Sequence, residues 1–126
     1  METQTKTESI IAGKAYDFAL LVIKLYKKLV EQREFVLSKQ ILRSGTSIGA
    51  NVNEEISAQS KRDFVHKLSI SLKEARETSY WLRLLKDSDY IDESVFNELF
   101  VKCDELIKIL TKIILTTKRK YFNSKL

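Results

Sequence analysis

Apolar side chains recur every three or four residues over most of the chain, the spacing that places side chains on one face of an α-helix. Four such rows predict helices over residues 6–32, 38–57, 61–87 and 92–120, and therefore an all-α protein. The rows are, in chain order, Ile11, Ala15, Phe18, Val22, Leu25 and Leu29; Ile41, Ile48, Val52 and Ile56; Val65, Leu68, Leu72, Ala75, Ser79 and Leu82; and Leu99, Cys103, Leu106, Leu110 and Ile113.

Polar residues stand at the expected start of each helix. They are Thr5 with Glu8 and Ser60 with Asp63, both spaced like a capping box, Asp92 as a candidate N-cap, and Ser38, after which the second helix is expected to begin. The connections between the helices are short, so neighbouring helices should run antiparallel. We expect a single domain over residues 1–126, folded as an up-down-up-down four-helix bundle.

The first and last helices carry more apolar residues than one core-facing stripe requires. The additional positions are Tyr16, Ile23 and Val30 in the first helix and Phe96, Phe100, Ile107, Ile109, Ile114 and Leu115 in the last. Apolar rows that one molecule leaves exposed commonly mark interaction sites. We therefore predict a homo-oligomer that assembles through these two helices.

Composition narrows the class of protein further. The chain has 126 residues, no proline and three glycines, a composition that argues against a turn-rich β-sandwich or barrel. Its longest apolar run, residues 18–23, is far shorter than the ~20 residues of a membrane span, and its polar start does not resemble a secretory signal. Its one cysteine cannot form an internal disulfide. We expect a cytoplasmic protein without a membrane partner.

Positive charge is concentrated at the C-terminal end. The chain carries a formal charge of +5, and residues 101–126 contain seven basic and two acidic residues, so the first hundred residues are neutral overall. This distribution favours an anionic partner, either RNA or DNA or an acidic protein. It is also typical of basic residues that complement the dipole of a C-terminal helix, and both readings stay open here.

No stretch of the chain supports an enzyme, a cofactor or a metal. Residues 44–50 (SGTSIGA) lack the spacing of a phosphate-binding loop and continue a helical period, which favours close helix packing. A dimetal site in a helical bundle needs two histidines besides its carboxylates, and this chain has one, His66. The candidate carboxylates would be Glu54, Glu55, Glu74 and Glu77. Cys103 lies on an apolar row, where burial raises the pKa of a thiol. Tyr80 and Trp81 favour packing over base stacking.

The middle of the chain resembles the 23S ribosomal RNA intervening-sequence protein family. Residues 35–54 read F-x-L-x-x-Q-I-x-R-S-x-x-S-I-x-A-N-V-x-E, and residues 58–85 read AQSKRDFVHKLSISLKEARETSYWLRLL, which is similar to the third helix of that family. The resemblance implies a four-helix bundle in a ring-shaped homopentamer. The similar accessory variability determinant proteins of diversity-generating retroelements are basic pentamers that bind nucleic acid and a reverse transcriptase.

Five residues occupy the polar positions of the family pattern: Arg43, Asn51, Glu54, Glu74 and Glu77. We interpret them as an interhelical network that fixes register, and a partner-binding surface is the alternative.

These observations predict a non-enzymatic, oligomeric nucleic-acid-binding or adaptor protein. Contacts through phosphate-binding cations would be weakly sequence-specific, and a pentamer would carry about +25. The expected cations are Lys108, Lys112, Lys118, Arg119, Lys120 and Lys125. The alternative is a protein-interaction scaffold that does not bind nucleic acid.

Overall fold

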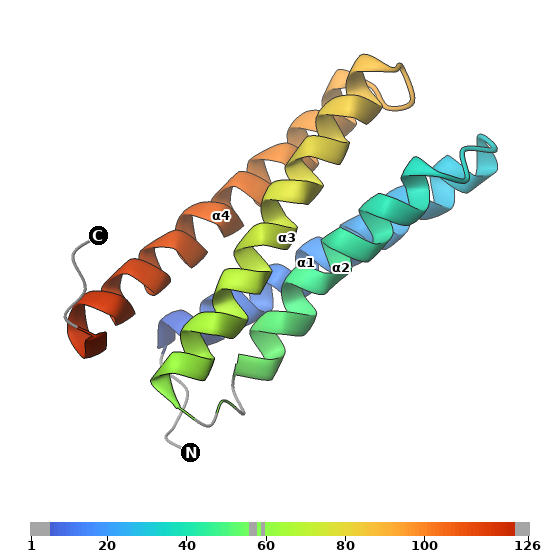
Figure 1. The fold of residues 1–126 in the computed structure, drawn as a ribbon. Coiled ribbons are helices and arrows are strands. Elements are labelled where there is room, and N and C mark those ends of the chain that lie inside the picture. Colours follow the sequence, from blue (N-terminus) through green and yellow to red (C-terminus); the bar gives the residue numbers. More distant parts are fainter. Residues whose placement is uncertain (1–5, 56–57, 59, 123–126) are drawn as a thin grey trace.

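The computed structural model describes residues 6–55, 58 and 60–122, and in these residues every regular element is a helix. The helices are α1 (Lys6–Glu31), α2 (Leu37–Glu55), α3 (Lys61–Asp87) and α4 (Glu93–Phe122), shown in Figure 1. The predicted all-α class with four helices is confirmed. The structure ends α4 two residues later than the sequence pattern predicts and starts α2 one residue earlier.

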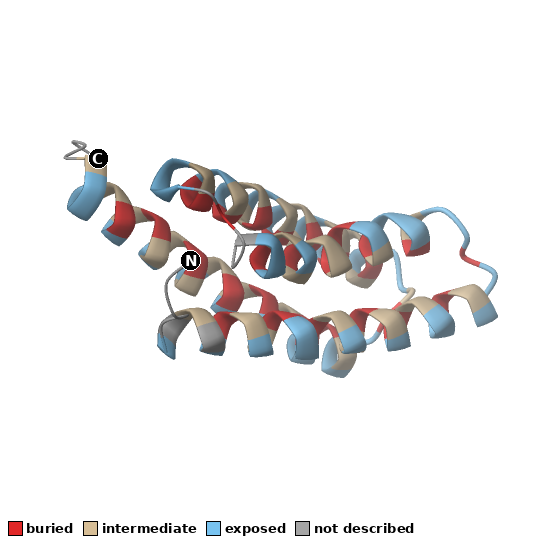
Figure 2. Ribbon diagram, turned by 90° about the horizontal axis from the view of Figure 1, so that it is seen from below, coloured by how far each residue is buried: buried red, intermediate tan, exposed pale blue. Residues whose placement is uncertain are grey.

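The four helices pack around one hydrophobic core. Each helix contacts its neighbours in the chain, and α1 also contacts α4, which closes the arrangement. In Figure 1 the starts of α1 and α3 and the ends of α2 and α4 lie at the same end of the molecule. Buried positions face inward along all four helices, as Figure 2 shows. One continuous core therefore extends over the length of the helices.

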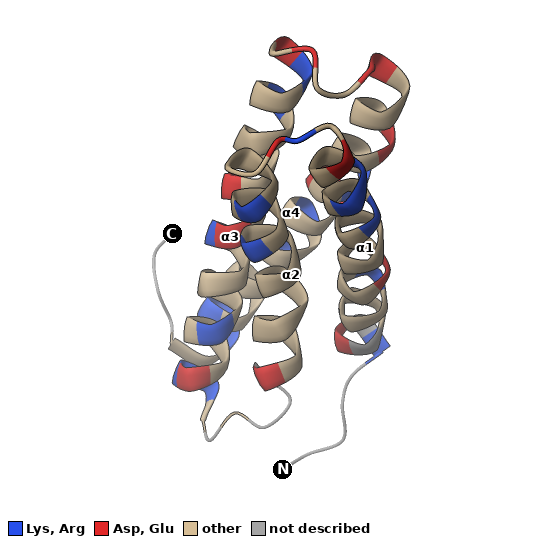
Figure 3. Cartoon of the chain, turned by 90° about the vertical axis from the view of Figure 1, so that its right-hand side faces the viewer, with Lys and Arg blue, Asp and Glu red and all other residues tan. Residues whose placement is uncertain are grey.

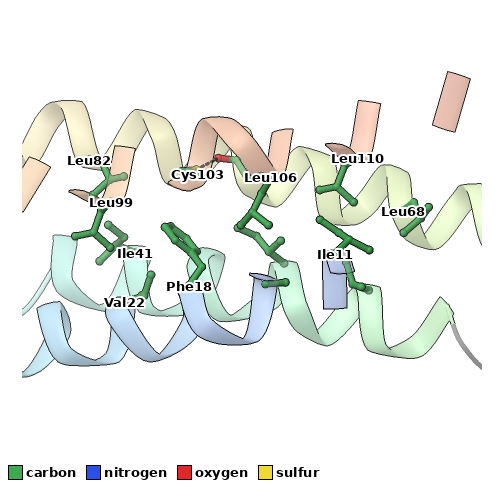
Figure 4. Packing of buried hydrophobic residues seen from close by; sticks show 14 of the residues in the cluster. Ile11, Phe18, Val22, Ile41, Leu68, Leu82, Leu99, Cys103, Leu106 and Leu110 are labelled. Carbon is green, nitrogen blue, oxygen red and sulfur yellow. Dashed lines mark hydrogen bonds between the residues drawn. The ribbon is translucent and has the colours of Figure 1, made fainter. Parts of the chain in front are cut away.

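Most residues of the predicted rows form this core. All six of the α1 row are buried, as are the described members of the α2 row, while Ile56 lies outside the described residues. Figure 4 shows Phe18, Leu99 and Leu106 pointing into the space between the helices. The predictions fail at three positions, Leu72, Ser79 and Ile113, which are only half-buried.

The buried face of α3 and α4 differs from the predicted row by one residue at those positions. Ser71 and Thr78 are buried in place of Leu72 and Ser79, and Ile114 in place of Ile113. A helix that packs between two neighbours buries a stripe wider than a single row. Which residues of that stripe are fully buried depends on where the neighbouring helices lie.

Helix caps agree with the sequence at two of the three described starts. The backbone N–H of Asp63 donates to Ser60 Oγ (3.1 Å), and that of Val95 donates to Asp92 Oδ1 (2.8 Å). At α2 the cap is the buried Glu34, whose carboxylate accepts from the backbone N–H of Ser38 (2.6 Å). The start expected after Ser38 is therefore wrong. The Thr5 cap lies outside the described residues.

The same turn ends α1 and α3 without a glycine. Arg33 and Asp89 both have φ of 64°, in the left-handed region. The next residue in each case donates its N–H across the turn, from Glu34 to Leu29 O and from Tyr90 to Leu85 O, both at 2.9 Å. This is the Schellman pattern that satisfies the last carbonyls of a helix.

Small residues bring α1 and α2 close together. A Cβ on Gly45 would lie 2.7 and 2.8 Å from the γ carbons of Val22, and one on Gly49 would lie 3.4 Å from the carbonyl oxygen of Ala15. Residues 44–50 are helical throughout. The prediction of close helix packing, in preference to a phosphate-binding loop, is confirmed.

The additional apolar rows are covered more fully than the sequence suggests. Phe96 and Ile114 are buried, and the remaining positions are half-buried apart from Tyr16, which is 65% exposed. Neighbouring helices account for this cover because α4 packs against both α1 and α3. Among the described residues of these two helices, the large apolar side chains exposed besides Tyr16 are Ile10 and Leu20 on α1 and Val101 and Tyr121 on α4. In the described part of the chain, no helix has the length and apolar character to cross a membrane.

Candidate nucleic-acid interface

The C-terminal half of α4 forms the walls of two neighbouring hollows. A groove of about 460 Å³ between α4 and the first turns of α1 and α3 is lined by Lys61, Lys112 and Lys120. A second hollow, of about 410 Å³, is lined by Lys108, Lys112 and Arg119. Lys112 and Thr116 line both. Four of the six predicted cations therefore gather around one stretch of α4.

The first turn of α3 adds two cations that the sequence analysis did not assign to this site. Lys61 Nζ lies 4.8 Å from the ring centre of Tyr121 and 5.5 Å from that of Phe64. Arg62 Cζ lies 5.9 Å from the ring centre of Phe122. The local pattern of residues 60–63 predicts only a helix cap. Pairing the start of α3 with the end of α4 would have indicated both residues.

Not every predicted cation is equally available. Lys108 Nζ is 3.0 Å from Asp104 Oδ2, one helical turn away, so part of its charge is already compensated. Lys118 is half-buried and lines neither hollow, and Lys125 lies outside the described residues. Figure 3 shows Lys and Arg at both ends of the molecule, so the site is a local cluster and not a charged face.

The predicted polar network joins three of its five members. Arg43 Nη1 donates to Glu74 Oε2 (2.8 Å), and Arg43 Nη2 pairs with Glu77, so one guanidinium on α2 binds two carboxylates on α3. The Arg43 side chain is half-exposed, while that of Glu74 is 14% exposed. This clamp lies at the edge of the core.

The other two members of the predicted network lie elsewhere. Asn51 donates within its own helix to Ser47 O (2.9 Å), and Glu54 pairs loosely with Lys67 at 3.8 Å. Buried hydroxyls, which the sequence analysis did not single out, link α2 and α3 more deeply. Ser71 Oγ donates to Ile48 O (2.8 Å), and the Thr78 and Ser44 hydroxyl oxygens are 2.8 Å apart. Register between these helices is therefore held by polar groups at several depths.

The one thiol lies in the core. Cys103 Sγ is 3.2 Å from the carbonyl oxygen of Ala75, the contact drawn in Figure 4. Burial, and to a lesser extent the nearby Asp104 carboxylate, raises the pKa of Cys103 to about 12. The thiol therefore stays protonated at neutral pH and is a poor nucleophile. Over the described ranges, no three metal-ligating side chains come together.

The aromatic pair in α3 is divided between core and surface. Trp81 is half-buried and packs against the core, and its ring lies 5.3 Å from that of Tyr80 at a steep angle. Tyr80 is exposed, with the Arg83 guanidinium 5.8 Å from its ring centre. The packing interpretation holds for Trp81, while Tyr80 faces solvent.

The chain belongs to the 23S rRNA-intervening sequence protein family, whose profile matches residues 7–112. It is also similar to a crystal structure of a protein of unknown function from the S23 ribosomal protein family of Bacteroides thetaiotaomicron VPI-5482. The two share 50% sequence identity and a TM-score of 0.84, over 86% of this chain and 97% of that one. Among curated proteins, none matches this chain. Lys118, Arg119, Lys120 and Lys125 follow the residues that the family profile matches.

Proposed function

We propose that this protein is a non-enzymatic, oligomeric nucleic-acid-binding or adaptor protein that contacts phosphates through the basic cluster of Lys61, Arg62, Lys112, Arg119 and Lys120. The observation that supports the proposal is that the start of α3 lies next to the end of α4. Lys61 is 4.8 Å from the Tyr121 ring centre, and Arg62 is 5.9 Å from the Phe122 ring centre. Cations from two helices in one place provide a stronger local field than a single charged turn.

The proposal includes the arrangement of the chain and of its copies. Short loops and the shared end of the helices in Figure 1 support an antiparallel up-down-up-down bundle. Exposed apolar side chains on α1 and α4 support a homo-oligomer, and the family resemblance favours a ring-shaped pentamer. The free, buried cysteine is consistent with the cytoplasm.

The test compares two charge-reversed variants of equal net charge. One replaces Lys112, Arg119 and Lys120 by glutamate, and the control replaces Lys24, Lys27 and Lys28, three exposed lysines near the end of α1. Arg119 and Lys120 lie in the last turn of α4 and Lys28 lies in the last turn of α1, so each variant carries a dipole penalty that its stability must show. Circular dichroism melts confirm that each variant is folded before binding is measured.

The expected result is a loss of RNA or DNA binding in the α4 variant and little change in the α1 control. The affinity of the wild type should fall steeply as the salt concentration rises. Removing three phosphate contacts should reduce the slope of log affinity against log salt concentration by roughly 2. Equal loss in both variants would indicate a response to net charge alone. Affinity that does not respond to salt would contradict phosphate contacts.

A protein-interaction scaffold is the second candidate, favoured by the exposed apolar residues Leu20 and Val101, which are 52% and 66% exposed. It predicts no nucleic-acid binding by the wild-type protein at low salt. The same titration therefore separates the two functions.

A further inference from the structure

We propose that the groove between α1, α3 and α4 binds unpaired bases, so that the nucleic acid the protein takes is single-stranded. This inference rests on the proposed function and specifies whether the bound nucleic acid is single-stranded or double-stranded. The groove combines cationic and apolar surface, whereas a phosphate backbone alone would need only the cations. Its rim carries Lys61, Lys112 and Lys120, and its lining includes the apolar side chains of Phe64 and Ile113.

The size and lining of the groove suit a partly apolar group next to negative charge. Its volume of about 460 Å³ is within the range of small-molecule sites. Three lysines line it against a single acidic residue, Glu8. A nucleotide offers both components, because its base presents an apolar face and its phosphate is anionic. A duplex would not offer base faces to the groove, since its bases are stacked on one another.

Tyr121 provides the aromatic surface. Its side chain is 47% exposed and lines the groove in the last turn of α4. The ammonium groups of Lys61 and Lys120 lie 4.8 and 5.2 Å from its ring centre. Lysine side chains are flexible, so an ammonium can move from the ring to a phosphate while a base stacks in its place. The exchange replaces an exposed cation–π contact with a stronger charge-assisted hydrogen bond.

A path for the strand continues beyond the groove. Lys112 and Thr116 line both hollows, and the second hollow adds Arg119 and Lys108. A strand that leaves the groove over Lys112 therefore meets further cations for the next phosphates. Alternating apolar and cationic surface of this kind is typical of single-strand binding proteins, which combine base stacking with backbone contacts.

The experiment separates bases from phosphates. Fluorescence anisotropy compares a labelled oligothymidylate, an abasic oligomer with the same number of phosphates, and a duplex of the same length. We expect the wild-type protein to bind the oligothymidylate about tenfold more tightly than the abasic oligomer. Tyr121→Ala should remove that difference and leave abasic binding unchanged, whereas Tyr121→Phe should keep it. Tyr80→Ala, at a tyrosine of α3 that is 48% exposed, is the matched control.

The outcomes distinguish this inference from the function on which it rests. Equal, salt-sensitive binding of thymidylate and abasic oligomers would overturn the base pocket and leave phosphate contact standing. Binding of the duplex as tightly as the oligothymidylate would overturn the preference for a single strand, and binding of none of the three ligands would overturn both proposals. A change in particle mass on Tyr121→Ala, measured by light scattering, would show that a second copy of the chain fills the groove and would overturn the inference.

Discussion

At the scale of single residues, Cys103 shows how burial controls chemistry. The side chain is fully enclosed between α3 and α4, and the desolvated thiolate is disfavoured. The folded pKa of about 12 lies above the free value of 9.0, so the folded state keeps its proton when the unfolded state loses it. Stability from this group is therefore complete below pH 9 and is lost as pH rises toward 12.

The prediction compares the wild type with Cys103→Ala. The free energy of unfolding of the wild type, relative to that of the variant, should be constant below pH 9 and should fall by about 1.4 kcal/mol per pH unit above it. Denaturant melts over this range measure the shift, and the alanine variant controls for tyrosine and lysine titration. Parallel curves at all pH values would show that the thiol is accessible to water.

Also at this scale, a reactive cysteine is not expected in the folded protein. Thiol reagents should modify Cys103 only in molecules that have opened or unfolded, and refolding should be faster than modification. Modification rates measured at several denaturant concentrations should follow the unfolding equilibrium. Rapid labelling in buffer would contradict the burial of this side chain.

At the scale of elements, the clamp between α2 and α3 has a measurable role. Glu74→Ala removes the better-buried carboxylate that binds Arg43, and we expect a loss of about 1–2 kcal/mol, with a lower melting temperature. Glu54→Ala, in a looser pair across the same two helices, is the control and should cost little. Unchanged stability together with loss of a partner would favour the binding-surface interpretation.

The contact between α1 and α2 gives opposite predictions for two glycines. Gly45→Ala should destabilise the protein because the new Cβ would lie within 2.8 Å of the stiff Val22 side chain. Gly13→Ala, where no atom lies within 4 Å, should instead stabilise it by about 0.5–1 kcal/mol through helix propensity. Thermal melts of both variants test this. A stabilising Gly45→Ala would mean that the helices are further apart than described.

At the scale of the whole molecule, the exposed apolar side chains of α1 and α4 predict assembly. Leu20→Glu should reduce the particle mass in light scattering without changing helical content, because the charge would lie within the interface. Val36→Glu is the control, since Val36 is also exposed but lies in the connection between α1 and α2. A wild-type monomer at micromolar concentration would contradict the prediction.

The sequence by itself determined the helices, most of their buried faces and the family. The helices and their buried faces depend on residues a few positions apart, such as neighbours in the row from Ile11 to Leu29 or the cap of Ser60 on Asp63, and the family depends on the order of residues along the chain. Only the tertiary structure decided which distant residues meet. Lys61 reaches Tyr121, and Arg43 reaches Glu74, through packing that no local period encodes. The Glu34 cap and the exact buried stripe of α3 likewise follow from how neighbouring helices approach, because side-chain spacing defines a face but not what covers it.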